Sequence, residues 1–247
     1  FQLEGEGMTK ALIQINPHST EDICYLLAAY RPGPIQFIPE YVAVKKGEKQ
    51  AEYIIDDLKP ILEVTNGVIS YQEQVMRIVV DIAGYSLSEA DNMRRAMGKK
   101  KMDVMLAEIE KFVEGGKKKG HDETKLKQLG DLLIKFANYG FNKSHAAAYA
   151  VISYYTAYLK AHFPLEYMAA LLEADLGRFD DVIKDTLECE RMGIKILPPS
   201  INKSGLYFNV EEGNIRFGLG SIKNVGTDIV KNIAMEREKN GEYISID

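Results

Sequence analysis

The 247-residue sequence predicts a mainly α-helical protein, a multi-helix domain followed by a small C-terminal β-hairpin and a helix–hairpin–helix-like segment. Two observations give this fold class. Up to about residue 193, apolar residues recur at the three- and four-residue spacing of amphipathic helices, and glycine, proline or asparagine separates the segments. Beyond that point apolar and polar residues alternate one by one, which is the period of a β-strand.

The first predicted helices are short. An amphipathic stretch, Met8–Ile15, ends at Asn16-Pro17, and a second helix runs from Thr20 to Tyr30 with acidic residues in its first turn. The sequence Arg31-Pro-Gly-Pro34 stops that helix, because proline cannot continue it.

Capping signals mark the helices of the middle region. Ser70-Tyr-Gln-Glu73 has the pattern of a capping box and predicts a helix that ends near Gly84. The following helix starts at Ser86 or Ser88 and ends at Met97. Two more are expected at Asp103–Glu114, which Gly115-Gly116 would stop, and at Asp122–Phe136.

The last third begins with the most apolar helix. Ser144–Ala161 carries so few charges that we expect it to be central in the fold. Short helices follow at Pro164–Glu173 and Asp180–Met192. Alternating apolar residues on both sides of a turn at 211–214 predict the hairpin. We therefore expect a helical domain at residues 1–175 and an extension at 176–247.

Composition excludes several classes of protein. Hydrophobic residues make up 46% and charged residues 27% of the chain, the balance of a globular protein, and no apolar run reaches the length of a membrane span. Cys24 and Cys189 are far apart and fit neither a disulfide nor a metal pattern. No catalytic triad, paired metal-binding carboxylates, P-loop or dinucleotide fingerprint is present. The sequence therefore predicts neither a metal site nor catalytic residues of its own.

The charge distribution favours a polyanionic partner. The net charge is −5, yet residues 94–143 hold 13 Lys or Arg against 7 Asp or Glu. Arg94-Arg-Ala-Met-Gly-Lys-Lys-Lys101 places five positive charges in eight residues. Cations stabilise a helix C-terminus, but five exceed that need, so we expect Arg94 and Arg95 to contact phosphate. The lysine run at 117–119 is more typical of a solvated face.

A second cationic feature precedes the apolar helix. A glycine turn brings Lys143, Ser144 and His145 to the start of that helix, where unpaired N–H groups attract anions. We expect Ser144 to cap the helix. A capped helix with a solvated lysine and a packed imidazole remains the alternative. Arg31 and Tyr149, the latter one turn beyond His145, are further candidates for the same pocket.

Several long motifs occur in order and carry a resemblance. They are Phe1-Gln-Leu-Glu4, Tyr30-Arg-Pro-Gly-Pro34, Tyr71-Gln-Glu-Gln-Val75, Ala83-Gly-Tyr-Ser86, Arg94–Lys101, Tyr139-Gly-Phe-Asn-Lys-Ser-His-Ala-Ala-Ala-Tyr149 and Leu159-Lys-Ala-His-Phe-Pro164. Over essentially its whole length the chain resembles the C-family replicative DNA polymerases, the alpha subunits of bacterial DNA polymerase III. The resemblance identifies it as the fingers region of a much longer subunit.

That resemblance implies a DNA-directed DNA polymerase, a nucleotidyltransferase of DNA replication in the cytoplasm, at the nucleoid-associated replisome. The partners implied are primer–template DNA, dNTP, the remainder of the subunit, and the sliding clamp and other replisome subunits through regions outside this chain. Mg²⁺ would be bound by palm aspartates that this chain lacks, so the isolated fragment should be inactive. No membrane partner is expected.

The resemblance also suggests roles for individual residues. Arg94, Arg95, Lys143, Ser144 and His145 would bind the dNTP phosphates, and His145 is a possible proton donor to pyrophosphate. DNA contacts would come from two places, which are Lys99, Lys100 and Lys101 in the basic run and Asn224 and Gly226 in a helix–hairpin–helix turn.

Two positions depart from the family pattern, and two other functions stay open. Met102 replaces an expected proline, and Asn224 replaces an expected glycine. The change at Asn224 puts the hairpin contact with DNA in doubt. A translesion alpha-type polymerase would share these motifs. A non-catalytic DNA-binding scaffold would bind DNA regardless of dNTP.

Overall fold

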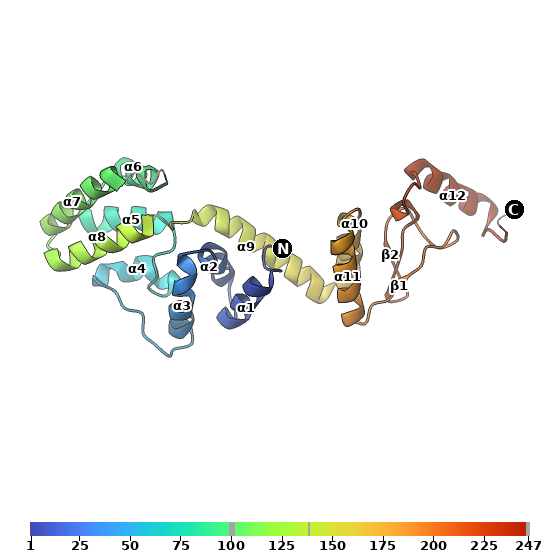
Figure 1. Cartoon of the computed structure of the whole chain (residues 1–247), viewed down its shortest axis with the longest axis horizontal. Coiled ribbons are helices and arrows are strands. Elements are labelled where there is room, and N and C mark those ends of the chain that lie inside the picture. The colour runs from blue at the N-terminus through green and yellow to red at the C-terminus, as the bar shows by residue number, and fades with distance from the viewer. Residues whose placement is uncertain (99–101, 138, 246–247) are drawn as a thin grey trace. The chain divides into compact units, whose positions relative to one another are not determined.

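The computed structural model describes residues 1–98, 102–137 and 139–245 (Figure 1). The chain forms two compact units, residues 1–154 and 155–247, which are described separately below. Helices dominate and the few strands lie near the C-terminus, so the predicted fold class is confirmed. The expected domain division after residue 175 stays a prediction.

The described residues form twelve α-helices, with short 3₁₀ turns between some of them. The helices are α1 (Glu6–Ile15), α2 (Thr20–Ala29), α3 (Ile38–Lys45), α4 (Lys59–Leu62), α5 (Gln72–Ala83), α6 (Leu87–Gly98), α7 (Met102–Lys118), α8 (Glu123–Ala137), α9 (Lys143–His162), α10 (Pro164–Ala174), α11 (Phe179–Arg191) and α12 (Thr227–Asn240). The 3₁₀ turns are η1 (Pro34–Phe37), η2 (Asp56–Leu58), η3 (Glu63–Thr65) and η4 (Leu219–Ser221).

Helices α1, α2 and α3 share the first core of unit 1. Tyr25 and Tyr41 stack there with ring centroids 3.7 Å apart. The Tyr41 hydroxyl donates to Asp22 at 2.7 Å, and Lys45 forms an ion pair with the same carboxylate at 2.7 Å. Burial alone would raise the pKa of Asp22, but the bonds from Lys45 and Tyr41 outweigh it and hold that pKa at about 2. The contacts of Tyr41 and Lys45 with Asp22 therefore hold α3 against the start of α2.

The second core of unit 1 joins α4, α5, α6, α7 and α8. Here the expected stop at Gly115-Gly116 is wrong, because α7 continues through both glycines to Lys118. A Cβ on Gly115 would lie 2.3 Å from the Ala83 carbonyl oxygen, and one on Gly116 would lie 2.4 Å from a Leu126 methyl. The two glycines let α7 approach its neighbours closely instead of ending it.

The start of α5 also differs from the expected capping box. The helix begins at Gln72, and the side chain of Gln74 accepts hydrogen bonds from the amides of Ser70 at 2.9 Å and Tyr71 at 3.0 Å. Ser70 and Glu73 were the predicted pair. Glu73 is thereby left to bond another part of unit 1.

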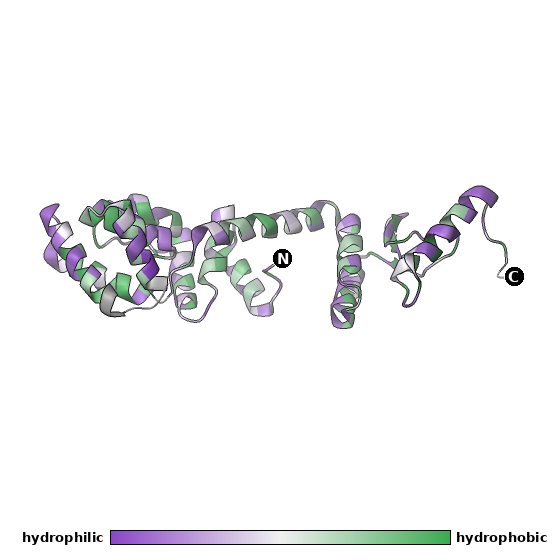
Figure 2. Cartoon of the chain, turned by 90° about the horizontal axis from the view of Figure 1, so that it is seen from above, coloured by the Kyte–Doolittle hydropathy of each residue, from purple (hydrophilic) through white to green (hydrophobic). Residues whose placement is uncertain are grey.

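The prediction that the most apolar helix is central is wrong. On α9 only Ala146, Ala150 and Ser153 are buried. Val151 and Ile152 are 40% and 44% exposed, and Leu159 in the second unit is 44% exposed. Figure 2 shows this long helix, near the middle of the picture, with green apolar residues along it. None of the described helices combines the length and apolar content that a membrane span requires.

Unit 2 packs α10 and α11 against a small three-stranded sheet. Strands β2 (Asn209–Glu211) and β3 (Asn214–Arg216) form the predicted hairpin, shorter than expected, and their turn uses positive φ at Glu212 and Gly213. Strand β1 (Ile196–Leu197) pairs parallel to β3 and was not predicted. Two residues are too few to show a strand period in a sequence.

Candidate functional site

Two chain segments far apart in sequence meet at the start of α9. Tyr71 and Phe141 form a parallel β-bridge, in which the Gln72 amide donates to the Phe141 carbonyl at 2.9 Å and the Phe141 amide to the Ser70 carbonyl at 3.2 Å. Helices α5 and α9 both begin directly after this bridge. The first turns of the two helices are therefore held side by side.

Asn142, not Ser144, caps α9. Its side-chain oxygen accepts a hydrogen bond from the His145 amide at 2.8 Å, the bond that an N-cap residue makes to the third helical residue. Ser144 already lies inside the helix, at its second position. The predicted cap at Ser144 is wrong by two residues, and its hydroxyl is left for another partner.

A carboxylate of the protein itself lies at the N-terminus of α9. The two oxygens of Glu73 accept from the Lys143 amide at 3.0 and 2.9 Å, and one also accepts from the Asn142 side chain at 3.0 Å. A negative charge is stabilised at this end of a helix by the dipole and by the unpaired amides. Glu73 therefore makes contacts that the sequence assigned to an external anion.

The Lys143 ammonium also has an internal partner. It lies 3.1 Å from the Glu21 carboxylate, at the start of α2, and 5.5 Å from the centre of the Tyr71 ring. Ser144 and His145 are exposed. In the described part of the chain, the Ser144 hydroxyl and amide have no hydrogen-bond partner. The Ser144 hydroxyl and amide are thus available to a ligand, whereas the Lys143 amide and ammonium contact carboxylates.

Arg31 and Tyr149 belong to the same region. The Arg31 guanidinium lies 4.5 Å from the Phe141 ring centre and donates to the Tyr139 carbonyl at 2.8 Å. Burial lowers the pKa of Arg31. The His145 ring lies 5.7 Å from Phe141 and 4.4 Å from Tyr149. The structure therefore brings together five of the predicted site residues, Arg31, Lys143, Ser144, His145 and Tyr149.

Arg94 and Arg95 have a different partner. Both guanidiniums form ion pairs with the carboxylate of Asp91 on the same helix, at 2.8 Å each. Their hydrogen bonds, with Arg94 the larger contribution and Arg95 the next, lower the pKa of the Asp91 carboxyl. Within the described residues, no hydrogen bond or ion pair connects either arginine with the start of α9. Arg95 is the more accessible, with 66% of its side chain exposed.

The predicted DNA contacts fall into two groups. Lys99, Lys100 and Lys101 lie outside the described residues. In unit 2, Asn224 has φ +69°, a left-handed conformation that favours glycine and that asparagine tolerates, so its replacement of a glycine leaves the turn possible. Gly226 is the N-cap of α12, and both residues are exposed.

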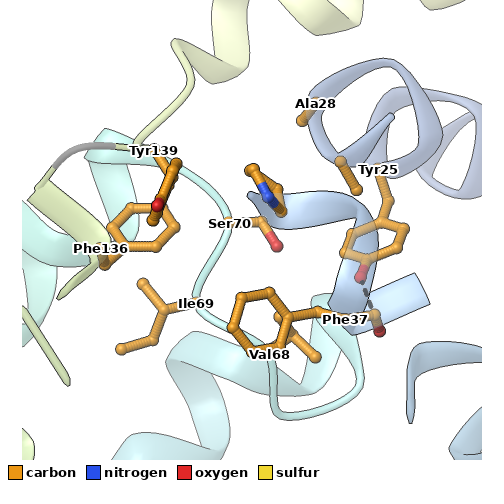
Figure 3. Close-up of a pocket in the computed structure, with 10 residues that line it drawn as sticks. Tyr25, Ala28, Phe37, Val68, Ile69, Ser70, Phe136 and Tyr139 are labelled. Atoms are coloured by element: carbon orange, nitrogen blue, oxygen red, sulfur yellow. Dashed lines mark hydrogen bonds between the residues drawn. The ribbon is translucent and has the colours of Figure 1, made fainter. Parts of the chain in front are cut away.

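Two hollows border Tyr139 in unit 1 without including the start of α9. The smaller, about 10 Å³, has Phe136 and Tyr139 on one side and Tyr25 and Phe37 on the other (Figure 3). A larger groove of about 730 Å³ shares Phe37, Phe136 and Tyr139. The described lining residues of both exclude Lys143, Ser144 and His145. Among the described residues, no three His, Cys, Asp or Glu side chains form a group suited to a metal.

Sequence reasoning missed three residues of this site. Asparagine is a favoured capping residue, and its place two residues before the predicted helix start at Ser144 could have identified Asn142. Glu73 was predicted to cap its own helix, and no local pattern links it to Lys143, seventy residues later. Glu21 was read only as a helix-start residue.

Comparisons with known proteins agree with the resemblance. Residues 1–120 match the family described as "Bacterial DNA polymerase III alpha subunit finger domain", and residues 193–247 match the helix–hairpin–helix motif family. The chain is 48% identical to the DNA polymerase III subunit alpha of Borreliella burgdorferi over 247 residues, 100% of this chain and 22% of that protein.

Two other alpha subunits are similar to the same extent. That of Thermus aquaticus is 46% identical over 251 residues, covering 100% of this chain and 21% of the relative. That of Escherichia coli is 45% identical over 252 residues, covering 98% and 22%. The chain therefore spans about a fifth of the length of the curated relatives it matches.

Proposed function

Because this chain belongs to the family of bacterial DNA polymerase III alpha subunits, we propose that its finger domain binds the incoming dNTP and primer–template DNA during template-directed 5′–3′ synthesis. The whole subunit would be the enzyme, a DNA-directed DNA polymerase. The partners would be the remainder of that subunit, the DNA and the other replisome proteins, including the sliding clamp.

The start of α9 carries the proposal for the dNTP. Lys143 supplies a point charge, Ser144 an exposed hydroxyl and amide, and His145 an exposed ring, all within the first turn of a 20-residue helix. Phosphoryl transfer builds negative charge on phosphate oxygens, which fixed cations and N–H donors stabilise. We assign these three residues to the β- and γ-phosphates, with Arg31 and Tyr149 close by.

Arg94 and Arg95 have a secondary role in this proposal. Asp91 holds both guanidiniums, so they would have to leave that carboxylate to bind the triphosphate. Otherwise they would order the loop that binds it. Lys99–Lys101 would contact template or duplex phosphate. Asn224 and Gly226 would approach the duplex backbone through the turn before α12.

Divalent metal belongs to the proposed reaction but not to the described residues of this chain. They include no group of three or more His, Cys, Asp or Glu side chains suited to a metal. In this proposal, the palm of the full subunit would hold Mg²⁺. When bound there, it would activate the primer hydroxyl and clamp the triphosphate. The finger residues bind and orient the phosphates.

Lys143→Ala in the full-length subunit tests the phosphate site. Loss of a charged hydrogen bond should reduce kcat/KM for dNTP about ten- to a hundredfold, with binding of primer–template DNA retained. Lys10→Ala, which removes a lysine paired with Glu6, is the matched control. An unchanged kcat/KM in Lys143→Ala would reject the assignment.

His145 has a separate test as a proton donor to pyrophosphate. His145→Gln keeps a hydrogen-bonding side chain but cannot titrate. We expect the limb of the pH–rate profile that reports a general acid to disappear in this variant. A profile that keeps its shape would leave His145 with phosphate binding only.

The non-catalytic scaffold predicts a different result. Such a protein would bind DNA equally well with and without dNTP, and Lys143→Ala would change neither affinity. The exposed donors in the first turn of α9 favour the dNTP-binding function. A translesion alpha-type polymerase would share this site, and assays on damaged templates distinguish the two enzymes.

A further inference from the structure

At the start of α9, the amide and the ammonium of Lys143 are already paired with carboxylates of the protein itself. Glu73 accepts the Lys143 amide and Glu21 pairs with the Lys143 ammonium, so one residue is held by two acidic side chains. The amide and ammonium of Lys143 are the groups that bind phosphate in the proposed function. Lys143, Glu73 and Glu21 together carry one positive and two negative formal charges.

We propose that Glu73 and Glu21 form a displaceable carboxylate latch, which holds Lys143 and the α9 N-terminus until the phosphates of the incoming nucleotide replace it. This inference rests on the proposed function and adds a device that regulates the same site. Glu73 and Glu21 are positioning residues here, since each acts through Lys143.

Because phosphate is also negatively charged, its binding requires the two carboxylates to move away from Lys143 or their contacts with Lys143 to lengthen. The one N–H of the Lys143 amide is taken by Glu73, so it cannot give the same hydrogen bond to phosphate. The Lys143 ammonium has three donors, so Glu21 opposes phosphate there mainly through its charge. Two carboxylates within a few ångströms would also repel a triphosphate that carries several negative charges. In this arrangement Lys143 is therefore paired with the protein's own acids, and Ser144 and His145 are the residues of the first turn that stay accessible to phosphate.

The geometry permits such an exchange. Glu21 is 46% exposed and Glu73 is half-buried, so both side chains can turn toward solvent. Asn142 keeps α9 capped through its bond to the His145 amide, which does not involve Glu73. The hydroxyl and amide of Ser144, one position beyond Lys143, can donate to a phosphate before either acid leaves. Helix α9 thus has no need of Glu73 to stay formed.

The test separates charge from hydrogen bonding. Glu73→Gln keeps an oxygen that accepts the Lys143 amide but removes the charge, and Glu21→Gln does the same at the ammonium. In the full-length subunit we expect each to lower the KM for dNTP about two- to fivefold with kcat unchanged. Asp81→Asn is the matched control, since it removes an acid from the same helix, about 12 Å further along α5.

Each outcome has a defined meaning. An unchanged or increased KM in both glutamine variants overturns the latch and leaves Glu73 as a permanent part of the fold. If Lys143→Ala does not affect dNTP use either, the phosphate site itself is wrong. If Lys143→Ala weakens dNTP use while the glutamine variants match the parent, only the latch fails.

Discussion

Asn142 bonds two different parts of unit 1 at the point where α9 begins. Its oxygen caps the helix through the His145 amide and its nitrogen donates to Glu73. Ser144, two residues on, has the better-known capping side chain but lies inside the helix. At the residue scale, the position within the first turn decides the role, and residue type alone does not.

This contrast gives a prediction at the residue scale. Asn142→Ala should destabilise the first turn of α9 by about 1 kcal/mol, because the His145 amide loses its acceptor. Ser144→Ala should change it by less than about 0.5 kcal/mol, as for an exposed substitution. Hydrogen-exchange mass spectrometry of peptides that cover residues 143–150 would measure both. Equal protection in the two variants would contradict the assignment of the cap.

Helix α7 shows what local signals miss at the scale of elements. A glycine pair ends many helices, but here the residues that matter are on neighbouring helices. The Ala83 carbonyl and the Leu126 side chain occupy the space where the Cβ atoms would be. No property of residues 102–118 alone reveals that contact.

Gly115→Ala is the corresponding prediction. Helix propensity alone would make alanine favourable by about 1 kcal/mol. The clash with the Ala83 carbonyl should instead destabilise the core of α4 to α8 by about 1–3 kcal/mol, because backbone cannot move aside cheaply. Lys118→Ala, exposed on the same helix, should be nearly neutral. The free energies of urea unfolding of the variants and the parent would decide; a stabilised Gly115→Ala would exclude the clash.

Across the whole molecule, the sequence predicted the fold class and most helices because burial imposes a period on each element. It also placed Lys143, Ser144 and His145 with Arg31 and Tyr149, which lie in one region of the structure, but it grouped them with Arg94 and Arg95, which pair with Asp91 instead. It did not find the contacts of Lys143 with Glu73 and Glu21, since partners seventy or more residues apart leave no local pattern. The exposure of α9 was missed for a related reason, because apolar composition does not say what covers a helix.

The basic middle of the chain gives a prediction at this largest scale. Replacing Lys99, Lys100 and Lys101 by glutamine in the full-length subunit should reduce the salt dependence of duplex binding by about 0.9 per lost phosphate contact. Lys117→Gln with Lys127→Gln is the control, because Glu123 already pairs with both lysines. The measurement is log Kd against log salt concentration. A slope that matches the parent would place these lysines away from DNA.

The bond from Glu73 to the start of α9 also has a consequence for synthesis on the ribosome. At about 5–20 residues per second, residue 143 is made roughly 4 to 14 seconds after residue 73. During that interval Tyr71 has neither its bridge partner Phe141 nor cover from Ala146 and Ala150. Until α9 emerges, the nascent chain therefore lacks both the backbone partner of Tyr71 and part of the apolar cover of its ring.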